Sequence, residues 1–456
     1  MNKIVRHPAS FKDPAGFIFE SGGKIYRQVN QRYADEFKLL IDSGLYAKLT
    51  SQKQLLSHSA VADNFTGDNE WFTTILPEQL EHISYPYEWS FDQLRDAALL
   101  TLSILKTAIT HGMILKDATA FNIQFHKGRP VFIDTLSFGK YDPEKPWVAY
   151  RQFCEQFLFP LYLEHYLKTD MIPLLSAHHT GISASLTARL LPWRSKWNLG
   201  VRLHVLLQRN VSERKQEPNP RITFSKTKLM NVILHLESII KGLKNRYSEQ
   251  TTWSNYYDET ILGPQYLAAK EKLVTEFLTG MEFSTVLDLG ANDGHFTRLV
   301  ASMGKDVVAA DSDSKCINGL YAYAKETKST NILPLVIDLS NPSPAIGFGN
   351  NERAAFGSRM KSDVVLALAL IHHLVIGKNI PFDLVANYFA SFGKILIVEF
   401  VPREDEKVKQ LLSSREDVFD DYDERGFEKS FLRHYSIRKK QVIPGTFRVL
   451  YSLERI

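Results

Sequence analysis

The chain has 456 residues, 44% of them hydrophobic and 23% charged, a composition that supports a sizeable core and excludes a disordered protein. Its length exceeds what one hydrophobic core usually supports, so we expect two domains. The most apolar stretch, 97–115, is interrupted by Lys106 and His111, and no secretory signal opens the chain, so we expect a cytoplasmic protein without a transmembrane segment. The two cysteines, Cys154 and Cys316, match no metal-ligand spacing, which disfavours a disulfide framework and a metal site.

The most informative segment of the first half is HGMILKDATAFNIQFHKGRPVFIDTLSF. Asp117 precedes Asn122 by five positions, and Asp134 follows an apolar strand. This segment resembles the catalytic loop of protein kinase-like phosphotransferases, in which the first acid orients the acceptor hydroxyl while the asparagine and the second acid hold metal and phosphates. The resemblance implies an α+β kinase-like domain over residues 1–210.

Departures from the kinase pattern predict that phosphoryl transfer is lost. Leu115 stands in place of the usual histidine, Thr135 and Leu136 replace Phe-Gly, and no convincing glycine loop covers the phosphates. By the resemblance, Arg27 stands where a lysine normally lies, with Glu36 as its partner, and arginine does not replace a compact point charge. We therefore expect a degenerate kinase-like scaffold, that is, a pseudokinase. An active kinase, or aspartates that only form turns, are the alternatives.

A strongly basic segment follows. Residues 189–246 hold thirteen Lys or Arg against three acidic residues, a net charge of +10, and Pro218 and Pro220 interrupt the segment. We interpret 211–250 as a basic linker and helix between two domains. Such charge can meet a phosphate-bearing substrate, RNA or an anionic membrane surface, or it can simply solvate a linker.

The second half alternates short apolar runs with amphipathic stretches, which predicts an α/β domain with a parallel sheet over 251–456. The strand candidates are STVLDLG, DVVAADS, ILPLVIDL, SDVVLALAL and GKILIVEF. Two final runs, SIRKKQVIPG and FRVLYSLERI, predict an antiparallel hairpin that closes the sheet edge.

The first of these strands leads into a glycine-bearing turn, DLGANDGHF. Gly290 allows a sharp turn and Gly294 allows close approach of a ligand or helix. The spacing differs from the GxGxxG of dinucleotide sites, and an acid beside the loop suits a cationic ligand.

The run TVLDLGANDGHF resembles motif I of class I S-adenosylmethionine (SAM)-dependent methyltransferases, and later motifs follow in the family's order. The resemblance implies a Rossmann-like seven-stranded methyltransferase sheet and SAM as cofactor. It also implies that Asp311 binds the ribose hydroxyls, that Asp338 receives the adenine amino group, and that Leu339 lies beside the ring. The expected cofactor-binding residues are Asp288, Gly290, Ala291, Asn292, Gly294, Asp311, Asp338, Leu339, Trp253 and Tyr266. We expect the aromatic rings of Trp253 and Tyr266 to lie against the cofactor. Alternatively, both are packing residues at the domain junction.

The loop after the fourth strand indicates the methyl acceptor. It reads Leu-Ile-His-His-Leu over 370–374, without the Asn/Asp-Pro-Pro-Tyr/Phe motif of nitrogen methyltransferases and without a nucleophilic cysteine. A neutral imidazole can deprotonate a hydroxyl, so we predict His372 as general base, His373 as its packed neighbour and Glu399 as the acid that orients the imidazole. This arrangement is similar to that of sugar and small-molecule O-methyltransferases. Alternatively, both histidines are structural and alignment alone drives transfer.

The whole chain also resembles nodulation-related bacterial methyltransferases, with which it shares LALIHHL, VEFVP and SREDVF. The leading hypothesis is O-methylation of a glycan, lipid-linked or small-molecule hydroxyl. A bifunctional kinase and methyltransferase is the second hypothesis. A protein that binds RNA or an anionic surface through its basic segment is the third.

Overall fold

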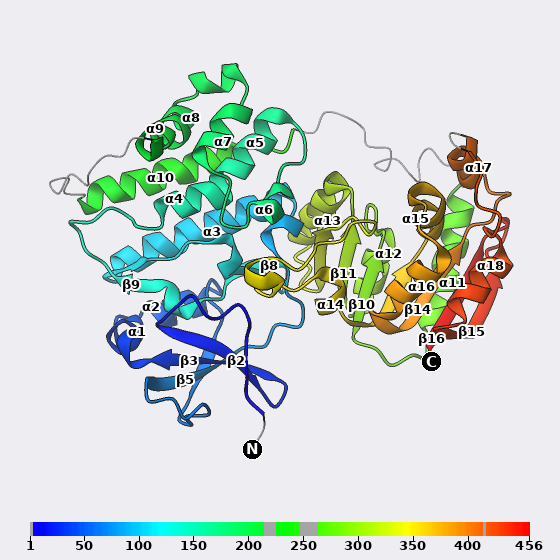
Figure 1. The fold of residues 1–456 in the computed structure, drawn as a ribbon, viewed down its shortest axis with the longest axis horizontal. Helices are drawn as coiled ribbons and strands as arrows, with labels where there is room; N and C mark the ends of the chain where they lie inside the picture. The colour runs from blue at the N-terminus through cyan, green and yellow to red at the C-terminus, as the bar shows by residue number, and fades with distance from the viewer. Residues whose placement is uncertain (1–2, 214–224, 247–262, 414–415) are drawn as a thin grey trace. The chain divides into compact units, whose positions relative to one another are not determined.

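The computed structural model describes residues 3–213, 225–246, 263–413 and 416–456 (Figure 1). The chain forms two compact units: unit 1 consists of Met1–Ser248 with Ala345–Arg353, and unit 2 of Glu249–Pro344 with Ala354–Ile456. Trp253, one of the expected cofactor contacts, lies outside the described residues. None of the helices in the described ranges is long and apolar enough to cross a bilayer.

Unit 1 begins with a five-stranded antiparallel sheet in the order β1-β2-β3-β5-β4. The strands are β1 (Val5–Arg6), β2 (Gly16–Ser21), β3 (Lys24–Asn30), β4 (His58–Val61) and β5 (Trp71–Pro77). Between β3 and β4 the chain forms η1 (Gln31–Tyr33), α1 (Ala34–Asp42) and α2 (Leu45–Ser51). One face of the sheet is apolar because Val29 and Ile75 are buried against Tyr33 and Phe37, and this contact holds α1 on the sheet.

The rest of unit 1 is mainly helical and is built around α3 (Phe91–Thr110). Ser90 and Gln93 form a capping box that fixes the start of this helix. Two antiparallel strand pairs follow: β6 (Met113–Leu115) pairs with β9 (Phe138–Lys140), and between them β7 (Ile123–His126) and β8 (Arg129–Phe132) form a hairpin. The short helices around them are η2 (Pro86–Glu88), η3 (Ala120–Asn122) and η4 (Thr135–Ser137).

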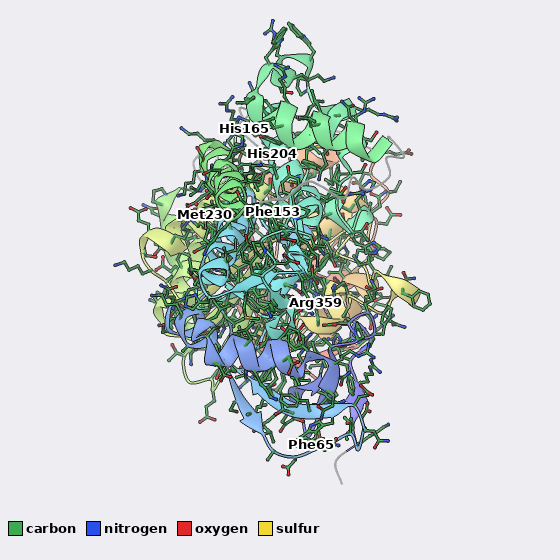
Figure 2. The ribbon with its side chains drawn as sticks, turned by 90° about the vertical axis from the view of Figure 1, so that its left-hand side faces the viewer. Phe65, Phe153, His165, His204, Met230 and Arg359 are labelled. Carbon is green, nitrogen blue, oxygen red and sulfur yellow. The ribbon has the colours of Figure 1, made fainter. Side chains whose placement is uncertain are left out.

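The later helices of unit 1 gather at the end away from β2, β3 and β5 (Figure 1). They are α4 (Tyr150–Phe153), η5 (Cys154–Leu158), α5 (Phe159–Leu167), α6 (Leu174–Ala177), α7 (Ala184–Leu190), η6 (Trp193–Trp197), α8 (Leu199–Val201), η7 (Arg202–Leu206), α9 (Leu207–Glu213) and α10 (Lys226–Gly242). Figure 2 shows Phe153 and His204 among these helices, and both side chains are buried. The basic segment therefore includes ordered helices, and α10 packs against α3.

Unit 2 contains a seven-stranded sheet in the order β12-β11-β10-β13-β14-β16-β15, as the resemblance to methyltransferases predicts. The strands are β10 (Thr285–Leu289), β11 (Asp306–Asp311), β12 (Ile332–Val336), β13 (Ser362–Ala367), β14 (Gly393–Phe400), β15 (Tyr435–Val442) and β16 (Val449–Arg455). The first five are parallel, and the last two form the expected antiparallel hairpin beside β14. The prediction of an α/β sheet with a terminal hairpin is confirmed.

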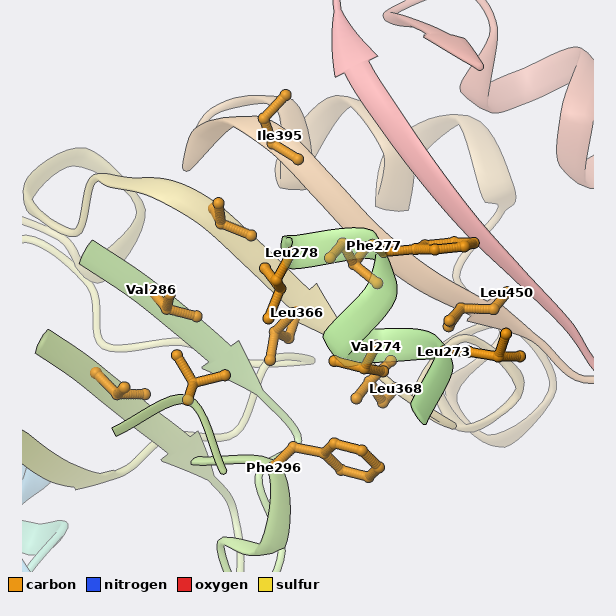
Figure 3. Close-up of a cluster of buried hydrophobic side chains, with 14 of the residues drawn as sticks. Leu273, Val274, Phe277, Leu278, Val286, Phe296, Leu366, Leu368, Ile395 and Leu450 are labelled. Atoms are coloured by element: carbon orange, nitrogen blue, oxygen red, sulfur yellow. The ribbon is translucent and has the colours of Figure 1, made fainter. Parts of the chain in front are cut away.

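Helices cover this sheet, which explains why the parallel strands are apolar along their whole length. They are α11 (Pro264–Leu278), α12 (His295–Ser302), α13 (Ser314–Glu326), α14 (Phe356–Arg359), α15 (Ile371–Lys378), α16 (Phe382–Ala390), α17 (Glu406–Ser413) and α18 (Glu424–Phe431). The short helix η8 (Phe348–Asn350) lies between β12 and α14 in the sequence but belongs to unit 1. Figure 3 shows Val274 and Phe277 of α11 in the cluster formed with Val286, Leu366 and Leu450 of the sheet.

Candidate functional site

The loop between β10 and α12 turns sharply through two glycines with left-handed backbone angles. Gly290 has φ of +74° and Gly294 has φ of +82°. A Cβ on Gly294 would lie 2.5 Å from the Leu320 side chain, and one on Gly290 would lie 3.1 Å from Leu370. Gly294 therefore lets the loop pack onto α13, and Gly290 lets it approach the residues before α15.

Asp288, the acid before this turn, holds the loop to the helix that follows it. Its carboxylate accepts a hydrogen bond of 2.6 Å from the Thr297 hydroxyl of α12, and its side chain is buried. Burial raises the pKa of Asp288 to about 6, against the opposing effect of the Thr297 hydrogen bond. Asp288 does not belong to the wall of the cavity described below, so in this structure it supports the loop from behind.

Asp311, at the end of β11, connects the loop to the next strand. One carboxylate oxygen accepts a hydrogen bond of 2.8 Å from the backbone N–H of Asn292, and the other accepts one of 2.9 Å from Asp313. Burial raises the pKa of Asp311, although these backbone hydrogen bonds favour the charged form. Asn292 itself adopts a left-handed φ of 51°, which turns its N–H toward Asp311.

A cavity of about 140 Å³ opens beside this loop. It lies at the carboxyl ends of β10, β11 and β13, where the strand order changes direction, which is the place where open α/β sheets bind ligands. Its wall consists of Gly290, Asn292, Asp311, Ser312, Ile337, Asp338, Leu339, Ser340, Leu368, Ala369, Leu370, His373, Leu374 and Lys378. Five of the predicted cofactor residues are in this wall: Gly290, Asn292, Asp311, Asp338 and Leu339.

The other predicted cofactor residues in the described ranges do not line the cavity. Ala291 is buried in a cluster with Ala309 and Leu320, so it supports the loop from inside the fold. Gly294 supports the packing of the loop, as described above. Tyr266 is 6% exposed, and its hydroxyl is hydrogen-bonded to Glu399, so it is a packing residue here.

The two histidines at the start of α15 have different surroundings. His372 is fully buried, and neither of its ring nitrogens has a hydrogen-bond partner within the described residues. His373 lines the cavity, with its ring centroid 4.0 Å from that of His372. Burial, together with the nearby cations Lys407 and Arg448, lowers the pKa of His373 to about 4. Sequence reasoning selected His372 as the residue facing the acceptor; of the two histidines, His373 is the one that lines this cavity.

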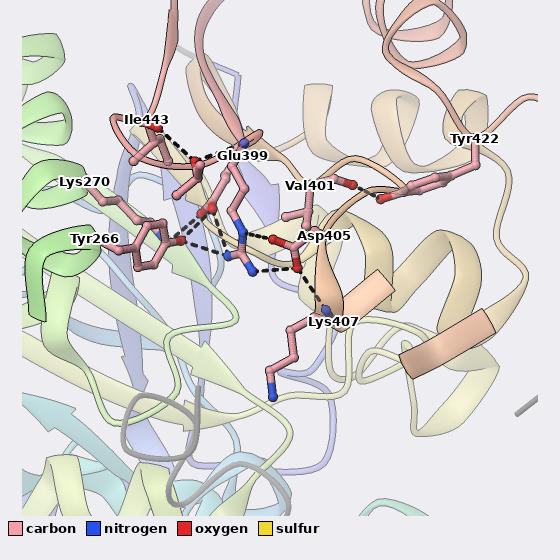
Figure 4. Close-up of polar contacts among 10 residues, drawn as sticks. Tyr266, Lys270, Glu399, Val401, Asp405, Lys407, Tyr422 and Ile443 are labelled. Atoms are coloured by element: carbon pink, nitrogen blue, oxygen red, sulfur yellow. Dashed lines mark hydrogen bonds and ion pairs between the residues drawn. The ribbon is translucent and has the colours of Figure 1, made fainter. Parts of the chain in front are cut away.

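The predicted contact between Glu399 and His372 is absent from the described structure. Glu399, at the end of β14, lies 2.5 Å from the Lys270 ammonium, and it accepts hydrogen bonds of 2.7 Å from Tyr266 and 3.1 Å from Arg448 (Figure 4). Burial by itself would raise the pKa of Glu399, but the two cations hold it lowered, at about 2. Glu399 is thus a charged member of a buried ionic network at neutral pH.

Arg448 extends this network to the loop after β14. Its guanidinium makes a two-pronged contact with Asp405, with distances of 2.7 and 3.0 Å. Lys270, Arg448 and Glu399 are all fully buried, and together they join α11, β14 and the final hairpin. Sequence reasoning missed Lys270 and Arg448, because one lysine in an amphipathic helix and one arginine before a strand look like ordinary surface residues.

In unit 1 the structure brings the four predicted kinase-like residues together. Asp134 forms an ion pair with Arg27 at 2.5 Å and accepts a hydrogen bond of 2.7 Å from the Ser137 hydroxyl. The same hydroxyl oxygen accepts a hydrogen bond of 3.0 Å from the Asn122 side-chain amide. Burial raises the pKa of Asp117, and the nearby charge of Asp134 raises it to a smaller extent. Arg27 also pairs with Asp13 at 3.5 Å, so the carboxylates observed beside it are Asp134 and Asp13 and not the expected Glu36.

The seven-stranded mixed sheet, the glycine loop and the cavity at its switch point define unit 2 as a domain of the methyltransferase fold class. Nodulation protein NoeA of Rhizobium meliloti (strain 1021) is 33% identical to the chain over 466 residues, which cover 99% of this chain and 96% of that protein. The chain therefore belongs to the NoeA family. No family model matches it.

Several solved structures align with about half of the chain. The PH0226 protein of Pyrococcus horikoshii OT3 is 17% identical with a TM-score of 0.32, covering 44% of this chain and 99% of that one. The bifunctional kinase-methyltransferase WbdD is 17% identical with a TM-score of 0.30, covering 48% and 45%. The N-methyltransferase NodS of Bradyrhizobium japonicum WM9 is 11% identical with a TM-score of 0.30, covering 43% and 99%.

Proposed function

We propose that unit 2 is a SAM-dependent methyltransferase. The observation that carries this proposal is the position of Asp311, whose carboxylate is fixed by the glycine loop and stands in the wall of the cavity at the switch point of the sheet. Such a carboxylate accepts two hydrogen bonds from a ribose diol. Apolar Ile337 and Leu339 stand beside Asp338 in the same wall, a combination that suits the flat, apolar faces and polar edge of an adenine ring.

We further propose that the acceptor is a hydroxyl group and that His373 takes its proton. SAM, when bound, supplies an electrophilic methyl group on a sulfonium centre. The pKa of His373 is about 4, so its imidazole is neutral at pH 7 and available as a base. His372 lies behind it as a buried neighbour. Glycan, lipid-linked and small-molecule hydroxyls all fit this chemistry.

Calorimetric titration of the full chain with SAM tests the proposed function. A single binding event of micromolar affinity is expected, because micromolar constants are typical of cofactor and substrate binding to enzymes. Incubation with methyl-labelled SAM and host extracts, followed by fractionation, would then identify the methylated product. Absence of SAM binding at millimolar concentration would refute the proposal.

Replacing His373 with alanine should slow methyl transfer by about 10²–10⁴-fold while leaving SAM affinity nearly unchanged, since general base catalysis contributes that much. The matched control is Lys378→Ala, because Lys378 lines the same cavity but carries no imidazole. Single-turnover rates and calorimetric affinities measured side by side separate the two effects. A His373 variant that transfers methyl groups at the wild-type rate would show that alignment alone drives the reaction.

The lowered pKa of His373 also makes stability depend on pH. The imidazole has its ordinary value of 6.5 when unfolded and about 4 when folded, so between these values the unfolded chain binds more protons. Stability should therefore be fully present above pH 6.5 and decline as the pH falls toward 4. Burial also lowers the pKa of His372, which therefore acts in the same direction. Denaturant titrations of wild type and His373→Ala across this range would measure the difference.

For unit 1 we propose a kinase-like scaffold that does not transfer phosphate. The Arg27 guanidinium pairs with Asp134, the carboxylate to which the kinase resemblance assigns the metal, and a cation at that position disfavours a second cation there. Titration with Mg-ATP should give no binding heat. If Mg-ATP binds and Asp134→Asn abolishes that binding, unit 1 instead contains a functional nucleotide site, and the hypothesis of a bifunctional kinase and methyltransferase gains support.

A further inference from the structure

Among the residues of unit 1 that the structure describes, the largest group of exposed apolar side chains comes from the consecutive elements η6 to α9. Trp193 is 66% exposed, Trp197 is 77% exposed and Leu199 is 62% exposed, followed by Leu203 at 40% and Leu207 at 51%. Large side chains exposed together usually mark a binding surface, because water contact with so much apolar area is unfavourable. We call these five residues the tryptophan patch.

The side chains of the tryptophan patch are exposed by ordered helical structure. Pro192 starts η6, and the Ser195 hydroxyl donates a hydrogen bond of 2.6 Å back to the Pro192 carbonyl. Ser195 is buried, whereas the tryptophans on either side of it are exposed. In the helix that follows, Val201 and Val205 are fully buried, so the opposite face carries the three leucines of the patch at a spacing of four residues.

The charged side chains around the tryptophan patch are all positive. Arg189, Arg194, Lys196 and Arg202 are exposed, and the Arg194 guanidinium lies 5.4 Å from the centre of the Trp193 ring. The sequence from 171 to 212 contains no aspartate or glutamate. None of these four cations has a carboxylate partner in the part of the chain that the structure describes.

We propose that the tryptophan patch docks unit 1 on the surface of an anionic lipid bilayer. Tryptophan prefers the boundary between headgroups and acyl chains, leucines enter the acyl region, and arginine and lysine contact anionic headgroups. RNA is the less suitable ligand. Nucleic acid is bound by aromatic and cationic side chains, and the three exposed leucines offer no ring on which a base could stack. The patch lies on the membrane and does not span it. This inference is independent of the methyltransferase proposal.

Sedimentation of the full chain with vesicles of phosphatidylcholine, with and without phosphatidylserine, tests this docking. Binding is expected to the anionic vesicles and to weaken with salt. Trp193→Ser with Trp197→Ser should weaken binding by about tenfold for each tryptophan, as expected for loss of a buried apolar side chain. Arg194→Glu with Lys196→Glu should weaken it by roughly fivefold or more for each charge. Brominated acyl chains should quench wild-type tryptophan fluorescence and spare the Trp193→Ser, Trp197→Ser variant.

Leu384→Ser is the matched control, since Leu384 is 60% exposed but lies on α16 in unit 2. It should bind vesicles like wild type. Should the tryptophan variant unfold, Leu199→Ser with Leu207→Ser provides an independent test of the same patch. The proposal is overturned if wild type ignores anionic vesicles, or if binding depends on charge alone without fluorescence quenching. It is also overturned if the patch binds a single-stranded oligoribonucleotide or a protein and not the vesicles.

Discussion

Replacing Arg448 with methionine is expected to lower the free energy of unfolding of unit 2 by about 3–5 kcal/mol, the usual result of removing one partner from a buried ion pair. The guanidinium is fully buried and contacts both Asp405 and Glu399. Its loss leaves Asp405 without this partner and leaves Glu399 with Lys270 and Tyr266 alone. Denaturant titration monitored by circular dichroism would measure the change.

Arg433→Met is the control for this experiment. Arg433 pairs with Asp383 at 2.7 Å, but the two side chains are 56% and 46% exposed. Solvent screening makes such a surface pair worth about 1 kcal/mol or less. If Arg448→Met and Arg433→Met lower stability equally, the buried network does not stabilise unit 2. A matching pH dependence is expected from Glu399: its contribution is present above pH 4.5 and is lost as the pH falls toward 2, because its folded pKa lies near that value.

Replacing Asp311 with alanine should weaken SAM binding by about ten- to hundredfold, because hydrogen bonds to a charged group contribute roughly 1.5–3 kcal/mol. The carboxylate is proposed to receive the ribose hydroxyls, and it also fixes the Asn292 amide of the glycine loop. Calorimetry with SAM and with S-adenosylhomocysteine should show the same loss, since the two ligands share the ribose.

Asp306→Ala supplies the comparison within the same strand. Asp306 is exposed at the opposite end of β11, and its replacement should leave SAM affinity unchanged. Asp311→Asn, which keeps one acceptor oxygen, should fall between alanine and wild type. Retention of wild-type affinity by Asp311→Ala would place the cofactor elsewhere and would refute the site proposed for unit 2.

The sheet of unit 2 was predictable because its strands have a strong local signature. Strands covered on both faces are apolar at most positions, and all five residues of β10, TVLDL, are buried. Turn residues also carry their own signal, as the positive φ angles of Gly290 and Gly294 show. The kinase-like residues of unit 1 were found by spacing, yet the spacing could not show that Arg27 pairs with Asp134 and Asp13 instead of Glu36.

The site was predicted only in part. Residues at strand ends, such as Asp311 and Asp338, were identified because parallel strands bring their carboxyl ends to one edge. Which of His372 and His373 faces the cavity depends on how α15 is rotated against its neighbours, and a two-residue pattern does not contain that rotation. The partners of Glu399 come from α11 and from the final hairpin, far away in sequence.

By itself the sequence determined the alternation of strands and helices, the glycine turn and the acids at the strand ends, because each depends on residues that are neighbours along the chain. Only the tertiary structure decided that His373 lines the cavity, that Glu399 belongs to an ionic network with Lys270 and Arg448, and that Trp193 and Trp197 stand exposed. The physical reason is that burial, ion pairing and exposure depend on which distant segments meet, and this is fixed by packing of the whole fold.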